Sequence, residues 1–261
     1  MSWEYSPRVR KILLAGDSWS QGEFARVNAS DSNPGGEGFC QLTHPGISHY
    51  LHSAYEDLWL CNVGDTGLSN NESFDRLITN VHPNDEYDAV LYFYTCPMRC
   101  FCDQHLQVKQ YPADISIEEI IGEADMFAKR IFERLNELPW PVLLIGGHVD
   151  VPEYLLDEGN YPNLHVACSS MKNLGLPDRE LVYYDWATIP RGLDWIVPDK
   201  KFPFSGRVQL ELERKAVYYN TQWMENYMLF PDGGHAGRML HQKLAYECVI
   251  PKLKQMYPEK Y

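Results

Sequence analysis

The chain has 261 residues, of which 44% are hydrophobic, and a net charge of −13 from 36 acidic and 23 basic side chains. This composition is typical of a folded globular protein. The acidic balance disfavours a nucleic-acid surface or an anionic membrane as the partner.

The sequence also bears on localisation. No apolar run approaches the roughly 20 residues of a membrane span, and the polar residues 1–10 contain no secretory signal. Seven cysteines, an odd number, favour reduced thiols over a disulfide framework. We therefore expect a cytoplasmic protein.

Short aliphatic or aromatic runs bounded by Gly, Asn, Asp or Pro predict strands that are buried on both faces. The predicted strands are 11–15, 58–62, 89–94 and 142–145, with a fifth at 181–185 or, alternatively, at 164–167. Apolar residues at helical spacing predict helices over 47–55, 69–81, 116–138 and 236–256. Strands that alternate with helices predict a mostly parallel sheet covered by helices.

Residues 150–230 are rich in proline and aromatic side chains. We expect them to form a long irregular insertion, or lid-like loops, over the same sheet. No internal repeat and no linker rich in Gly or Ser divides the chain, so residues 1–261 are expected to form a single domain.

The first predicted strand ends in Gly16-Asp17-Ser18. In open α/β sheets, ligands and catalytic side chains gather at the carboxyl ends of the strands. A serine that starts the following helix has helix N–H groups beside it, which can stabilise a developing oxyanion. Ser18 is therefore a candidate nucleophile.

A serine nucleophile needs a histidine to take its proton and a carboxylate to orient that histidine. Asp232 and His235 lie three residues apart, ahead of the last predicted helix. The two glycines between them let the backbone turn so that the carboxylate reaches one imidazole nitrogen.

A third motif follows the second predicted strand, where two glycines, Gly64 and Gly67, precede Ser69. Glycines in such a turn can bring a backbone N–H close to a substrate oxygen. The alternative is a tight turn in which Ser69 caps the following helix.

These motifs together resemble the SGNH hydrolase superfamily, also called the GDSL esterases and lipases. The family's blocks match, in order, Gly16-Asp17-Ser18, Asn62-x-Gly64-x-x-Gly67-x-Ser69 and Asp232-x-x-His235. The resemblance implies Ser18 as nucleophile, His235 as general base and Asp232 as its orienting carboxylate, with the N–H groups of Ser18 and Gly67 as oxyanion donors. It also implies a three-layer α/β/α sandwich of flavodoxin-like kind, without a metal or an organic cofactor.

One block departs from the family's pattern. The family usually carries Gly-x-Asn-Asp after the third strand, but this chain has Thr95-Cys96-Pro97-Met98-Arg99 there. Losing one oxyanion donor typically costs about 100- to 1000-fold in turnover. Thr95 or Arg99 can substitute, and the guanidinium can also bind an anionic substrate group; alternatively, Arg99 pairs with a surface acid.

His148 follows the fourth predicted strand. It can line the substrate pocket or, with Asp150, act as a rival base; the simpler interpretation is a loop histidine satisfied by hydrogen bonds. Cys96, Cys100 and Cys102, with a histidine close behind, raise the question of a zinc site. The spacing lacks the usual Cys-x2-Cys knuckle, which favours free thiols.

The leading hypothesis is a serine esterase that hydrolyses a carboxylic ester through an acyl-enzyme on Ser18. The expected substrate is a small-molecule ester or acylated glycan, with a small acyl group on a carbohydrate or similar alcohol. The alternative is a protein that keeps the fold but acts as a binding or structural component. A nucleotide binder is disfavoured because no glycine-rich phosphate loop follows the first strand.

Overall fold

The structure is a computed structural model that describes residues 9–27, 39–81, 86–95, 117–147, 149–171, 174 and 236–261. Its strands are β1 (Arg10–Ala15), β2 (Glu23–Val27), β3 (Phe39–His44), β4 (Leu58–Asn62), β5 (Ala89–Tyr94), β6 (Val142–Gly146) and β7 (Leu164–Cys168). Its longer helices are α2 (Ile47–Ala54), α3 (Asn70–Asn80), α4 (Ile117–Asn136) and α5 (Glu153–Gly159). The remaining helical segments are α1 (Ser18–Gln21), α9 (Arg238–Lys243), η3 (Leu244–Val249) and α10 (Ile250–Met256).

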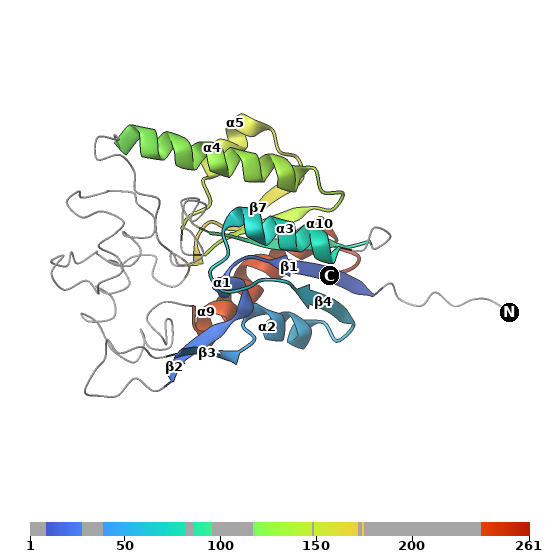
Figure 1. Cartoon of the computed structure of the whole chain (residues 1–261). Coiled ribbons are helices and arrows are strands. Elements are labelled where there is room, and N and C mark those ends of the chain that lie inside the picture. Colours follow the sequence, from blue (N-terminus) through green and yellow to red (C-terminus); the bar gives the residue numbers. More distant parts are fainter. Residues whose placement is uncertain are drawn as a thin grey trace.

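Five strands form one sheet in the order β4-β1-β5-β6-β7, and every pairing in it is parallel. This is the flavodoxin-like order that the sequence predicts. Helices cover both faces: α4 and α5 lie on one side of the sheet, and α2 and α9 on the other (Figure 1). The fold is thus a three-layer α/β/α sandwich.

The central strand β5 shows why its sequence forms a strand buried on both sides. Leu91 and Phe93 belong to the cluster that contains α2 and the C-terminal helical segments. Tyr92 and Tyr94 belong to the cluster that contains α3, α4 and α5. Apolar side chains therefore alternate between the two cores at the period of a strand.

Three elements differ from expectation. The fifth strand of the sheet is β7, so the alternative near 164–167 is correct for this position, while 181–185 lies outside the described residues. The region expected to be irregular, 150–230, begins with the regular elements α5 and β7. An antiparallel hairpin of β2 and β3, which the sequence does not predict, follows α1.

The last predicted helix is a continuous run of α9, η3 and α10, with a π-helical turn in its middle. The turn changes which of its residues share a face. Five residues of an α-helix rotate by about 500°, which would place Val249 roughly 140° away from Leu244. Both are fully buried, and i→i+5 hydrogen bonding brings residues at this spacing onto one face.

At the amino edge of the sheet, the carboxylate of Asp88 binds the end of the chain. It accepts hydrogen bonds from the backbone N–H of Lys11 at 2.9 Å and from the hydroxyl of Tyr261 at 3.1 Å, and it pairs with the ammonium of Lys260. The hydroxyl of Tyr257 donates to the Asp88 carbonyl at 2.8 Å. These contacts attach the segment after α10 to β1 and β5.

Candidate active site

Ser18 is the first residue of α1 and is buried at the carboxyl end of β1. β1 pairs with β4 on one side and β5 on the other, and the strand order reverses at β1. Crevices at such a reversal are the usual ligand sites of open α/β sheets. The sequence therefore places its candidate nucleophile at the position where this fold binds ligands.

Asp17 holds the segment that carries Ser18 in place. Its Oδ1 accepts the backbone N–H of Trp19 at 3.0 Å, which caps α1, and its Oδ2 accepts the hydroxyl of Thr95 at 2.9 Å. Thr95 directly follows β5, so this second bond joins the ends of the two strands at the reversal. Because Asp17 and Thr95 are both buried, the bond is shielded from competing water.

Thr95 is in turn held by Asn70, the first residue of α3. The Asn70 side chain accepts the backbone N–H of Thr95 at 3.0 Å and donates to its carbonyl at 2.7 Å. The hydroxyl of Tyr92 donates to the Asn70 carbonyl at 2.6 Å, and burial raises the pKa of that phenol well above its ordinary value. The ends of β1 and β5 and the start of α3 thus form one hydrogen-bonded network.

The loop after β4 packs on α1 from the other side. Asn62 donates from its side chain to the Ser20 carbonyl at 2.8 Å and accepts the backbone N–H of Gly64 at 3.0 Å. A Cβ atom at position 64 would lie 1.8 Å from the Ser20 hydroxyl oxygen and 3.1 Å from the Ser20 Cβ, so a larger residue would have to displace this side chain. Gly67 has φ of +77°, a conformation that glycine adopts without strain.

Ser69 is the N-cap of α3, as the alternative interpretation of this loop predicts. Its hydroxyl accepts the backbone N–H of Glu72 at 3.3 Å, and the Glu72 carboxylate accepts the backbone N–H of Ser69 at 2.8 Å. This reciprocal capping box is a helix-start device. It does not conflict with a role for Gly67, because the cap uses groups that follow the glycine.

Several predicted site residues lie outside the described residues. These are Arg99, His148, Asp232 and His235, together with Cys96, Cys100 and Cys102. The structure resumes at Ala236, the residue after His235, and this alanine is buried in the cluster that also contains Trp19. Ser18, Gly67 and Thr95 are described, and all three follow strands at the carboxyl edge.

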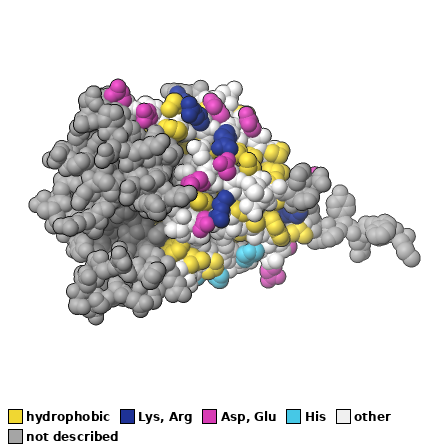
Figure 2. Space-filling model, viewed as in Figure 1, with side chains coloured by type: hydrophobic (Ala, Val, Ile, Leu, Met, Phe, Trp, Pro, Cys, Tyr) yellow, Lys and Arg dark blue, Asp and Glu magenta, His cyan; other side chains and the backbone are white. Residues whose placement is uncertain are grey.

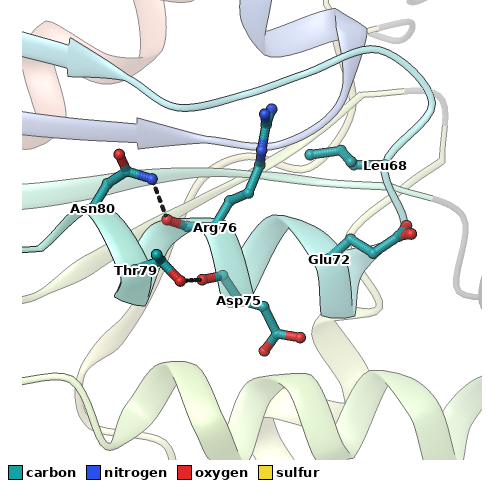
Figure 3. A pocket seen from close by; sticks show the side chains of 6 residues that line it. All are labelled: Leu68, Glu72, Asp75, Arg76, Thr79 and Asn80. Atoms are coloured by element: carbon teal, nitrogen blue, oxygen red, sulfur yellow. Dashed lines mark hydrogen bonds between the residues drawn. The ribbon is translucent and has the colours of Figure 1, made fainter.

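A groove of about 440 Å³ runs along the outer surface of α3 (Figure 3). It is lined by Leu68, Glu72, Asp75, Arg76, Thr79 and Asn80. Arg76 pairs with Asp65 at 2.6 Å, and the side chains of Thr79 and Asn80 bond to carbonyls of the helix. Acidic and basic side chains alternate over the described part of this face (Figure 2). The groove starts beside the Gly67 loop but is separate from the strand ends.

Two thiols lie close together on the face of the sheet opposite α3. Cys168, the last residue of β7, forms a hydrogen bond with Cys248 of η3. This bond, and burial, raise the pKa of the Cys168 thiol; the same bond lowers the pKa of Cys248 against the opposing effect of burial. Cys248 is therefore the more readily ionised member of the pair.

Three residues that organise this region carry no role in the sequence-based interpretation: Asp17, Asn70 and Glu23. Asp17 stands in the first motif and Asn70 directly follows the second, so capping and turn chemistry could have singled them out. Glu23 has no motif. It lies five residues after Ser18 and binds Arg238, 215 residues along the chain.

Wider comparisons add the following. No protein-family model matches the sequence, and no curated protein matches it. Within the described ranges, no three or more His, Cys, Asp or Glu side chains are grouped so that they could hold a metal ion. None of the helices that the structure describes is long and apolar enough to cross a membrane.

Proposed function

We propose that the protein is a serine hydrolase of SGNH type that cleaves a carboxylic ester through an acyl-enzyme on Ser18. The observation that carries this proposal is the position of Ser18 at the reversal point of the sheet, on a segment held by the Asp17–Thr95 bond. Holding the attacking oxygen in one geometry lowers the reaction barrier, because less orientational entropy is lost when the substrate reacts.

In the proposed reaction, the Ser18 hydroxyl oxygen attacks the ester carbonyl carbon while His235 accepts the hydroxyl proton. The tetrahedral oxyanion is stabilised by the backbone N–H groups of Ser18 and Gly67. Its collapse breaks the carbonyl–alkoxy bond, and His235 returns the proton to the leaving alcohol. A water molecule, deprotonated by His235, then attacks the acyl-enzyme, releasing the acid and restoring Ser18. Asp232 orients the imidazole throughout.

Of the groups in this proposed reaction, the two oxyanion donors belong to described residues, Ser18 and Gly67. Asp232 and His235 lie outside the described residues. Gly67 lies in the turn between β4, the immediate neighbour of β1, and α3, and its φ is positive. A small-molecule ester or an acylated glycan remains the substrate class that we propose.

The test is intact-mass analysis after treatment with a fluorophosphonate, which reacts with an activated serine whatever the acyl specificity. We expect a single adduct on the wild type, complete loss of that adduct in Ser18→Ala, and retention in Ser53→Ala. Ser53 is a suitable control because its hydroxyl is exposed and donates to the His49 carbonyl of its own helix. A folded wild type without an adduct would reject the hydrolase and favour a binding or structural component.

A further inference from the structure

The second buried carboxylate near Ser18 belongs to Glu23, the first residue of β2. One of its oxygens accepts the backbone N–H of Arg238 at 2.6 Å, and the other accepts a guanidinium N–H of the same residue, also at 2.6 Å. The hydroxyl of Thr43, on the partner strand β3, lies 3.2 Å from the carboxylate. Glu23 therefore binds both the main chain and the side chain of one residue.

These bonds are charge-assisted. Burial acts to raise the pKa of Glu23, but the hydrogen bonds and the charge of Arg238 outweigh it and lower that pKa below its ordinary value. A carboxylate that grips a backbone N–H and a guanidinium together fixes the direction of the chain as well as its distance. The Glu23–Arg238 contact is thus a rigid attachment between β2 and the first residue of α9.

Glu23 and Arg238 each lie close in sequence to a proposed catalytic residue. Glu23 lies five residues after Ser18, and Arg238 lies three residues after His235. Three residues span at most about 11 Å of extended chain. One contact to a buried carboxylate therefore joins the segment that carries the proposed nucleophile to the segment that carries the proposed base.

We propose that Glu23 is a positioning residue that aligns His235 with Ser18 through its bonds to Arg238. This inference rests on the proposed function, since it assigns His235 as the base. Glu23 does not touch the reacting atoms. It acts by fixing the first residue of α9, three residues after His235.

The amino edge supplies a matched control. Asp88 is also buried and pairs with a basic residue of the C-terminal segment, Lys260, but it does so where that segment ends. Asp88→Asn and Glu23→Gln each remove one buried charge that anchors the same helical run. A purely structural role predicts the same behaviour from both variants.

The experiment measures the rate of fluorophosphonate labelling of Ser18 against pH, with the melting temperature of each variant. We expect Glu23→Gln to slow labelling about 10- to 100-fold and to change the pH profile, while Asp88→Asn changes only the melting temperature. Arg238→Lys keeps the charge but loses the fork, and it serves as a milder variant if Glu23→Gln fails to fold. Equal labelling by wild type and both carboxylate variants would overturn the positioning role, as would losses that follow the melting temperature.

A second measurement does not depend on hydrolase activity. Histidine ring NMR follows the titration of His235, which is assigned by its absence in His235→Asn. We expect the His235 titration to shift in Glu23→Gln and to stay unchanged in Asp88→Asn. If the wild type carries no Ser18 adduct, the hydrolase proposal fails, yet a shifted titration still supports the coupling of Glu23 to His235. An unshifted titration rejects that coupling, whatever the labelling result.

Discussion

The two edges of the sheet each hold the C-terminal helical run by a buried carboxylate, but they differ in what those carboxylates organise. At the amino edge, Asp88 binds Lys11, Lys260 and Tyr261, and the contacts join secondary-structure elements to one another. At the carboxyl edge, Asp17 and Glu23 bind groups on segments that also carry candidate functional residues.

The comparison shows how one type of interaction serves two purposes in this fold. Both edges contain charge-assisted hydrogen bonds to a buried carboxylate, so the bonds alone do not distinguish a functional site from a structural contact. The two edges differ in which residues adjoin the aspartates that make these bonds. Asp17 immediately precedes Ser18, and it joins two strand ends at the reversal of strand order. Asp88 lies before β5, at the opposite end of the same strands.

Replacing one aspartate at each edge gives the sharpest contrast. Asp17→Ala removes the α1 cap and releases Thr95, and we expect fluorophosphonate labelling of Ser18 to fall about 100-fold because the proposed nucleophile is displaced. Asp88→Ala leaves buried donors unsatisfied and should lower the free energy of unfolding by about 1–3 kcal/mol without changing labelling. Labelling rates and denaturant titrations measure the two effects, and a loss of labelling in Asp88→Ala would contradict the contrast.

Two glycines offer a steric version of the same comparison. In Gly64→Ala the new methyl group meets the Ser20 hydroxyl at 1.8 Å, and we expect a destabilisation of about 1–3 kcal/mol from overpacking with slower labelling. In Gly122→Ala, within α4, the new methyl group meets open space beyond the helix's own backbone among the described residues, and the exchange should stabilise by about 0.5–1 kcal/mol. Thermal unfolding measures both, and a Gly64→Ala protein of wild-type stability would contradict the close packing on α1.

Acid titration isolates the Glu23 attachment. Because the pKa of Glu23 is lower in the folded protein than its ordinary 4.5, its stabilising contribution is complete above that value. The contribution is lost as the pH falls through the lowered pKa. Glu23→Gln should therefore flatten the melting-temperature curve as the pH falls below 4.5. A Glu23→Gln curve parallel to that of the wild type would contradict this stabilising role of ionised Glu23.

The smallest expected effect concerns the thiol pair. The hydrogen bond from Cys168 lowers the pKa of Cys248, whereas burial raises the pKa of Cys61. At neutral pH, a limiting amount of iodoacetamide should modify Cys248 ahead of Cys61 and Cys168, because the thiolate is the reactive form. Peptide mapping by mass spectrometry orders the three, and Cys168→Ser should slow the reaction at Cys248.

The sequence predicts most strands and helices of the fold because local patterns of apolar residues indicate them. Four aliphatic or aromatic runs predict β1, β4, β5 and β6, and four helical periodicities predict α2, α3, α4 and the C-terminal run. The hairpin of β2 and β3 is not predicted, because its strands mix polar and apolar residues without a clear alternation. β7 (LHVAC) and the run LVYYD at 181–185 are similar short patterns, so periodicity does not decide between the two segments.

The candidate site divides along the same lines. Ser18 and Gly67 stand out because strand ends and turn residues mark them locally. The partners that hold the site are distant in sequence: Thr95 lies 78 residues from Asp17, and Arg238 lies 215 residues from Glu23. No local pattern encodes such pairings, because only the packing of the whole sheet brings the two segments together.

The π-helical turn of η3 has a consequence for how this protein tolerates changes in length. From Leu244 to Val249 the helix contains one residue more than the four-residue step between buried positions on either side, at Leu240 and at Leu253. Deleting Tyr246, which is 44% exposed, leaves steps of four throughout, which an ordinary α-helix accommodates. Related chains that lack this residue are therefore expected to keep the same core, so a one-residue gap here in an alignment marks a change of helix type and not a change of fold.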